Sequence, residues 1–147
     1  MVARVIIDAN IFISYALSPN GSSAIVQAVE SIWIEPIQLI LPEILISEMR
    51  SAVERKPHLR ERIPIQDLED LIEALQAIAI PLYQDRPEIA QVLRDRRDDY
   101  LLDAAVHADV DCLVTGDRDL LDIRDQVYRP KIVTVREFLD LFEQMAE

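Results

Sequence analysis

The sequence predicts an α/β protein, a three-layer α/β/α sandwich built on a parallel sheet of four or five strands. Short apolar, β-branched runs alternate along the chain with longer segments of helical spacing, as expected for strands joined by helical crossovers. Half of the 147 residues are hydrophobic and only two are glycine, so the chain can bury a sizeable core. This length suits a single domain over residues 1–147.

The first part of the chain predicts two strands and two helices. Residues 2–7 form a short apolar run that ends at Asp8, as a buried strand followed by a turn would. Turn-forming residues at 18–21 interrupt the chain, after which Ser22 or Ser23 can cap a helix. The expected elements are, in order, a strand over 2–7, a helix over 11–17, a capped helix to Trp33 and a strand over 38–41.

The middle of the chain predicts helices and one short strand. Pro42 suits the first position of a helix, and Glu43 interacts favourably with the helix dipole in the first turn. This helix should reach Arg55, where Lys56-Pro57 would end it. Leucines and isoleucines three and four residues apart then predict a second, amphipathic helix. The expected elements are a helix over 42–55, a helix over 65–78, a strand over 79–82 and a short helix over 87–94.

The last third predicts two strands, each next to a helix. Asp98 and Asp99 can begin a helix that leads into an apolar strand. Residues 134–137 read Thr-Val-Arg-Glu, the capping-box pattern that opens a terminal amphipathic helix. The expected elements are a helix over 100–109, a strand over 112–115, a strand over 131–133 and a helix from 134 onwards.

Composition narrows the class of protein. No apolar stretch is long enough for a membrane span, and no secretory signal is evident at the start of the sequence. Cys112 lies in an apolar run, where a buried, reduced thiol in the cytoplasm is expected. A net charge of −12 disfavours an ordinary nucleic-acid binder, because affinity for phosphate comes largely from lysine and arginine. Either the acids cluster and bind cations, or they are scattered over the surface.

Four separated acids could supply a metal site. Asp8 and Asp117 follow predicted strands, and ligands of parallel sheets bind beyond the carboxyl ends of the strands, where the strand order reverses. Glu48 lies within a predicted helix and Asp99 begins another. Carboxylate oxygens are the ligands that Mg²⁺ and Mn²⁺ prefer. The sequence therefore predicts a metal centre at one edge of the sheet.

Four segments together resemble one family. Residues 5–14 read VIIDANIFIS, which is similar to the opening motif of PIN (PilT N-terminus) domains. Residues 46–50 (ISEMR), 98–105 (DDYLLDAA) and 113–120 (LVTGDRDL) follow in the order of the remaining acidic motifs. The resemblance spans nearly the whole chain, and the toxin components of toxin–antitoxin pairs (VapC-like) are the most similar group.

This resemblance implies an endoribonuclease that hydrolyses RNA phosphodiester bonds with Mg²⁺ or Mn²⁺. It also implies a cognate antitoxin as partner and a possible homodimer. The implied catalytic residues are Asp8, Glu48, Asp99 and Asp117; the implied metal ligands are Asp8, Asp99 and Asp117; the implied supporting residues are Asn10, Ser14, Thr115 and Asp119. Asp119 could equally join Asp117 at the metal or remain in solvent.

The basic residues offer several candidate contacts to RNA phosphates, although a solvated surface explains any single arginine as well. No basic and aromatic residues interleave as they do in a single-strand stacking platform. The main candidates are Arg50, Arg55, Lys56 and Arg118, with Arg60, Arg62, Arg94, Arg96 and Arg97 nearby.

Each acid also has a structural interpretation. Asp8 and Asn10 could form only a turn, and Asp99 could cap its helix, with Asp98 competing for the same role. Glu43 and Glu54 lie on the same helix as Glu48 and could replace it. Finally, Asp103 and His107 are four and eight positions after Asp99, a helical stripe that we interpret as a solvated face.

Three other classes of protein compete with the nuclease hypothesis. A phosphoryl-accepting receiver-like signalling module would need paired acids near its start and a lysine after its last strand, whereas Lys131 stands at the start of the last predicted strand. A haloacid-dehalogenase-like phosphatase would need an aspartate where Asn10 stands. A noncatalytic PIN-fold binding protein would keep the fold without the chemistry.

Overall fold

The computed structural model describes residues 2–17, 23–34, 36–83 and 96–146, without the side chains of residues 96–99, 145 and 146. In this part of the chain, five strands form one parallel sheet in the order β3-β2-β1-β4-β5. The predicted parallel α/β sheet is therefore confirmed, and it has the larger of the two expected strand numbers. The strands are β1 (Ala3–Ile7), β2 (Ile37–Pro42), β3 (Ile80–Leu82), β4 (Cys112–Val114) and β5 (Lys131–Val133).

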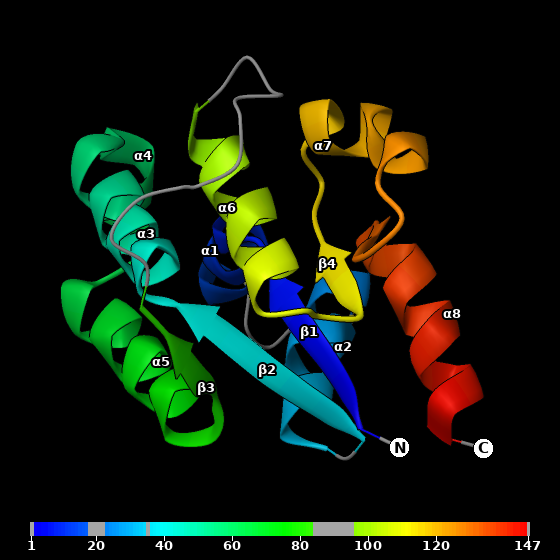
Figure 1. Cartoon of the computed structure of the whole chain (residues 1–147). Helices are drawn as coiled ribbons and strands as arrows, with labels where there is room; N and C mark the ends of the chain where they lie inside the picture. The colour runs from blue at the N-terminus through cyan, green and yellow to red at the C-terminus, as the bar shows by residue number, and fades with distance from the viewer. Residues whose placement is uncertain (1, 18–22, 35, 84–95, 147) are drawn as a thin grey trace.

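The strand order reverses between β1 and β4. The chain moves outward from β1 through β2 to β3, then crosses back over the sheet to β4 and moves outward again to β5 (Figure 1). Because all five strands are parallel, their carboxyl ends lie at one edge of the sheet. The strand order therefore reverses beside the carboxyl ends of β1 and β4, and ligands of such sheets bind beyond the strand ends at this point.

Helices cover both faces of the sheet. On one face α1 (Ala9–Leu17) contacts α2 (Ala24–Glu30) and α3 (Glu43–Arg55), and α2 contacts α8 (Val135–Ala146). On the other face α6 (Arg96–His107) crosses in front of the sheet, with α1 and α2 behind it (Figure 1). The remaining helical elements are η1 (Ser31–Trp33), α4 (Pro57–Arg62), α5 (Ile65–Ile78), α7 (Arg118–Asp122) and η2 (Arg124–Gln126).

The core lies where the helices pack against the central strands. Val5, Ile6 and Ile7 of β1 are fully buried, as expected for a strand covered on both faces. Phe12 of α1 and Phe138 of α8 are also fully buried. Within the described ranges, no helix is long and apolar enough to cross a bilayer. Asp8 directly follows this buried strand.

Several element boundaries differ from the sequence prediction. Pro42 is the last residue of β2, so α3 begins one residue later, at Glu43. Lys56-Pro57 ends α3 as expected, but Pro57 then occupies the first turn of α4, which the sequence analysis missed. The predicted helix over 87–94 lies outside the described residues, as does Ser22.

Two predicted helix caps are confirmed. Ser23 caps α2 through its hydroxyl, which accepts a hydrogen bond from the Val26 backbone N–H at 3.3 Å. At the start of α8, the Thr134 backbone N–H donates to Glu137 Oε1 at 2.9 Å, and the Glu137 N–H donates back to Thr134 Oγ1 at 3.2 Å. This reciprocal pair is the capping box that the sequence predicted.

Candidate metal centre

Asp8 lies at the junction of β1 and β4. Its backbone N–H donates to the Val114 carbonyl at 2.9 Å, which continues the pairing of the two strands by one more hydrogen bond. Asp8 also precedes α1, where its Oδ1 lies 3.4 Å from the Asn10 backbone N–H, as an N-cap would. The turn interpretation of Asp8 and Asn10 is therefore correct locally, and the same geometry presents a carboxylate at the sheet edge.

Thr115 connects the two acids at this edge. Its buried hydroxyl donates to Asp8 Oδ2 at 2.7 Å and accepts a hydrogen bond from the Asp117 backbone N–H at 3.0 Å. Asp117 in turn caps α7, because its Oδ1 accepts from the Asp119 N–H at 2.8 Å. One oxygen of each carboxylate is therefore fixed by a hydrogen bond, from Thr115 just after β4 for Asp8 and from Asp119 of α7 for Asp117.

The environment of Asp8 disfavours its charged form. The side chain is only 7% exposed, and this burial raises the pKa of Asp8 above its ordinary value, with the nearby Asp117 charge adding to the rise. Hydrogen bonds from Thr115 and the Asn10 backbone act in the opposite direction and lower the pKa. A cation beside Asp8 would stabilise the carboxylate that burial destabilises.

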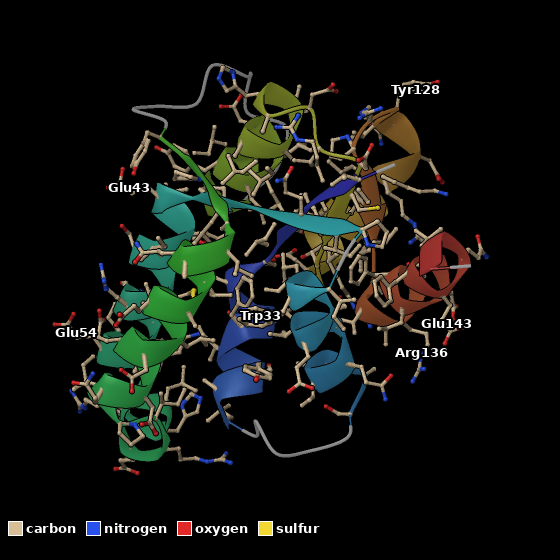
Figure 2. The ribbon with its side chains drawn as sticks, turned by 90° about the horizontal axis from the view of Figure 1, so that it is seen from below. Trp33, Glu43, Glu54, Tyr128, Arg136 and Glu143 are labelled. Carbon is tan, nitrogen blue, oxygen red and sulfur yellow. The ribbon has the colours of Figure 1, made fainter. Side chains whose placement is uncertain are left out.

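Asp8 and Asp117 open into a polar cleft of about 300 Å³. Glu48 of α3 lines the same cleft, so the structure brings together three of the four predicted acids. Glu43 and Glu54 do not line it, and Figure 2 shows Glu54 at the outer edge of the molecule. The α3 residues that face the cleft are Ser47, Glu48, Ser51, Ala52 and Arg55.

A second hollow of about 550 Å³ lies next to the same acids. Its lining includes Ser14 and Thr115, two of the predicted supporting residues. Asp8, Asn10 and Asp117 line both hollows, so the carboxylates stand where the two spaces meet. Asp119 lines neither hollow; its backbone positions Asp117 instead.

The fourth acid lies on α6. Asp99 is the fourth residue of this helix, so it is not the cap that the sequence allowed, and its side chain is outside the described part. Among the side chains that are described, no three acids or histidines gather tightly enough to hold one ion. Carboxylates from β1, α3 and α7 at one cleft nevertheless provide the hard oxygen donors that Mg²⁺ or Mn²⁺ requires.

The expected solvated stripe on α6 is wrong for one residue. His107 is exposed, but Asp103 is only 6% exposed and lies among the apolar residues Leu101, Leu102 and Ala105 that α6 buries. The helix turns this whole segment toward the core, since Ala104 is also fully buried. Spacing alone could not distinguish a solvated acid from a buried one.

The basic candidates separate into two groups. Arg55 and Lys56, at the end of α3, line the acidic cleft. Arg50 instead makes a paired contact with Glu69 of α5, with Nε–Oε2 and Nη2–Oε1 distances of 2.9 and 2.8 Å. Arg118 is exposed on α7 and lines neither hollow.

Sequence reasoning missed Ser47 and Ser51, which also line the cleft. With Arg55 they form a polar stripe at four-residue spacing along α3, so the three side chains share one face of the helix. The same stripe was visible in the sequence. It was missed because serine in a helix usually has no function.

The fold and the site define a parallel α/β protein with a carboxylate-lined cleft at the reversal of strand order. A family model described as "PIN domain" matches residues 4–119, so the chain belongs to the PIN domain family. The predicted resemblance is therefore confirmed. Membership in the PIN domain family argues against the receiver-like and phosphatase-like alternatives. No curated protein matches the chain significantly.

One solved structure shows the same fold. It is described as VapBC2 from Rickettsia felis bound to a DNA fragment from the promoter, and the matching chain is 12% identical in sequence. The match covers 89% of this chain and 96% of that chain, with a TM-score of 0.55. At this sequence identity the match shows a shared fold and nothing more, and the shared fold extends over nearly all of both chains.

Proposed function

We propose that this PIN domain protein is a divalent-metal-dependent endoribonuclease. The observation that carries the proposal is the pair formed by Asp8 and Asp117, which are held through Thr115 at the mouth of a polar cleft. The two acids also cap α1 and α7, but a buried carboxylate beside a second acid is costly without a cation. A bound cation would offset that cost.

The residues would divide the work as follows. Asp8, Asp99 and Asp117 would bind Mg²⁺ or Mn²⁺. Glu48 of α3 would be the fourth catalytic acid, on the opposite side of the cleft. When bound, the metal supplies Lewis acidity toward the phosphate and activates the attacking water. Asn10, Ser14 and Thr115 would orient the acids and exclude competing geometries. Attack by water on phosphorus would leave 5′-phosphate and 3′-hydroxyl ends.

Cleavage of a mixed panel of single-stranded and structured RNAs tests this proposal. We expect cutting with Mn²⁺ or Mg²⁺, none with EDTA, and a loss of more than about 100-fold in Asp8→Asn and Asp117→Asn. Arg129→Ala serves as the matched control, since Arg129 pairs with Asp109 and Asp111 and does not line the cleft. Cleavage that persists in folded Asp8→Asn would show a contaminant or another site.

The same assay can identify the acid that α6 contributes. Asp98 and Asp99 lie in its first turn, and Asp103 is buried one turn after Asp99. Asparagine at each position tests them separately. Loss of cutting only in Asp99→Asn would support the proposed ligand set, whereas loss only in one of the other two variants would replace Asp99 in that set.

We further propose that the chain is the toxin component of a toxin–antitoxin pair in the cytoplasm and that it can form a homodimer. The fold is that of a chain from a VapBC2 complex, and the net charge of −12 favours a basic protein partner. An antitoxin arginine placed in the acidic cleft would neutralise the acids and block the metal. Co-purification of a small basic protein, lost when the cleft charges are reversed, would support this role.

A noncatalytic PIN-fold binding protein is the second candidate, favoured by the same negative charge. It predicts stable capture of the basic partner and no RNA cleavage by wild type with either metal. Cleavage that depends on Asp8 and Asp117 would exclude it.

A further inference from the structure

Two hollows lie beside the acids at the carboxyl edge of the sheet, and we refer to the two together as the path. They share Asp8, Asn10 and Asp117, and otherwise extend over different elements. The first runs over α3, and the second runs over the start of α8 through Thr134 and Arg136. Their volumes of about 300 and 550 Å³ are within the range of ligand sites in proteins.

The helices place these two ends far apart. Along one face of the sheet the helices contact one another in the order α3, α1, α2 and α8, so α3 and α8 are the outer members of the layer. Figure 2 shows the same arrangement, with Arg136 on α8 on one side and α3 on the other. A ligand that occupied both hollows would lie beside the acids that the two hollows share.

Positive charge occurs at both ends of this path. Arg55 and Lys56 line the α3 end, and Arg136 lines the α8 end with an exposed side chain. The described part of the chain places no carboxylate in hydrogen-bonding contact with Arg136 or Lys56, whereas Arg50, Arg124 and Arg129 have acidic partners. The chain has a net charge of −12, yet basic side chains stand at both ends of the path and acidic side chains stand between them.

We propose that a single RNA strand crosses the site along this path, with its phosphates held on one side by Arg55 and Lys56 and on the other by Arg136. This inference rests on the proposed nuclease function and adds Arg136, which the sequence did not suggest. The scissile phosphate then lies over Asp8 and Asp117, with nucleotides on both sides. The contacts are to phosphate, so they position the strand and carry no sequence preference.

The salt dependence of RNA binding tests this arrangement. Each phosphate neutralised on a single strand contributes about 0.7 to the slope of log K against log salt concentration. Binding of a short labelled RNA is measured by fluorescence anisotropy in Ca²⁺, with RNA integrity checked on gels. We expect the slope to fall by about 0.7 in Arg136→Ala and by about 1.4 in Arg55→Ala/Lys56→Ala.

Two surface charges outside the path provide a matched control. Arg129→Ala/Lys131→Ala removes the same net charge as the α3 double variant, but Arg129 pairs with Asp109 and Asp111, and Lys131 lies at the amino end of β5. We expect its slope to equal that of wild type. All the substituted side chains are exposed, so circular dichroism and thermal unfolding should show unchanged folds.

The outcomes separate the path from the chemistry. If the slope does not change in Arg136→Ala, or if the control lowers it equally, the path is wrong even when wild type cuts RNA. If wild type does not bind RNA, the path is also wrong. If both slopes fall as expected but wild type does not cleave with Mn²⁺ or Mg²⁺, the path is supported and the proposed hydrolysis is contradicted.

Discussion

At the scale of single residues, the hydroxyl of Thr115 is the key connection of the site. A threonine hydroxyl has one proton and two lone pairs, and here the proton is directed to Asp8 while a lone pair accepts the Asp117 N–H. Alanine or valine at this position can make neither bond. Serine can make both, although without the methyl group that fills the buried position.

Thr115→Val should lower metal-dependent cleavage by about 10- to 100-fold, the usual effect of losing a residue that orients a metal ligand. The hydrogen bond from Thr115 lowers the pKa of Asp8, so its removal should raise that pKa and move the acid limb of the pH profile to higher pH. Thr115→Ser should restore the wild-type limb. The measurement is kcat/KM against pH, and an unmoved limb in Thr115→Val would contradict this role.

Residue positions were predictable where the backbone alone determines them. Asp8 and Asp117 follow buried strands, so their common edge could be inferred from the sequence. Arg50 could not be separated from Arg55, because its partner Glu69 is on another helix. Asp103 was misread for a similar reason: its burial depends on how α6 packs against the sheet, and spacing within the helix does not contain that information.

At the scale of elements, the long helices were predictable and the short ones were not. The spacing of apolar residues defined α5 correctly, over Ile65–Ile78. The helices α4 and α7 have only six and five residues, too few for a periodic pattern to develop. α4 packs against α3, and α7 packs against β5. Asp117 also caps α7, so its capping role and its proposed metal role coincide.

The capping box of α8 gives a prediction for stability. Glu137→Ala should destabilise the protein by about 1 kcal/mol or less, since the side chain is partly exposed and Arg124 also pairs with it. The Thr134 backbone hydrogen bond, with help from Arg124, lowers the pKa of Glu137 below its ordinary 4.5. This contribution is therefore present above pH 4.5 and is lost as the pH falls through the folded-state value.

Urea unfolding of wild type and Glu137→Ala at neutral pH and well below pH 4.5 measures the effect. Glu137→Gln is the control, because glutamine keeps the capping geometry without the charge. A destabilisation of Glu137→Ala that is the same at both pH values would show that the ionised carboxylate contributes nothing.

At the scale of the whole molecule, the proposed metal site would couple the negative charge of the cleft to the stability of the fold. Burial raises the pKa of Asp8 above its ordinary value of 3.8. The contribution of the protonated Asp8 side chain to stability is therefore fully present below pH 3.8 and is lost as the pH rises through the folded-state pKa. The metal-free protein therefore becomes less stable as the pH rises through this range. Metal that binds only the folded state should reverse this effect by mass action.

The stability ranking of wild type and Asp8→Asn should consequently invert with metal. Without metal at neutral pH, Asp8→Asn should be more stable, by about 1 kcal/mol. With Mn²⁺ or Mg²⁺ at about 100 times the dissociation constant, wild type should gain about 2.7 kcal/mol, and Asp8→Asn should gain much less. Thermal unfolding with and without metal measures both. An equal gain in the two proteins would show that the metal binds elsewhere.

The pairing of β1 with β4 also determines when in the life of the chain the site can exist. Asp8 is made before its partners Val114 and Thr115, which come more than a hundred residues later. A nascent chain that has completed only β1, β2 and β3 contains Asp8 and Glu48 but lacks the other half of the acid pair. On the proposed nuclease function, this order leaves the growing chain without the acid pair, and so without the ability to cut RNA, until β4 and the residues after it have been made.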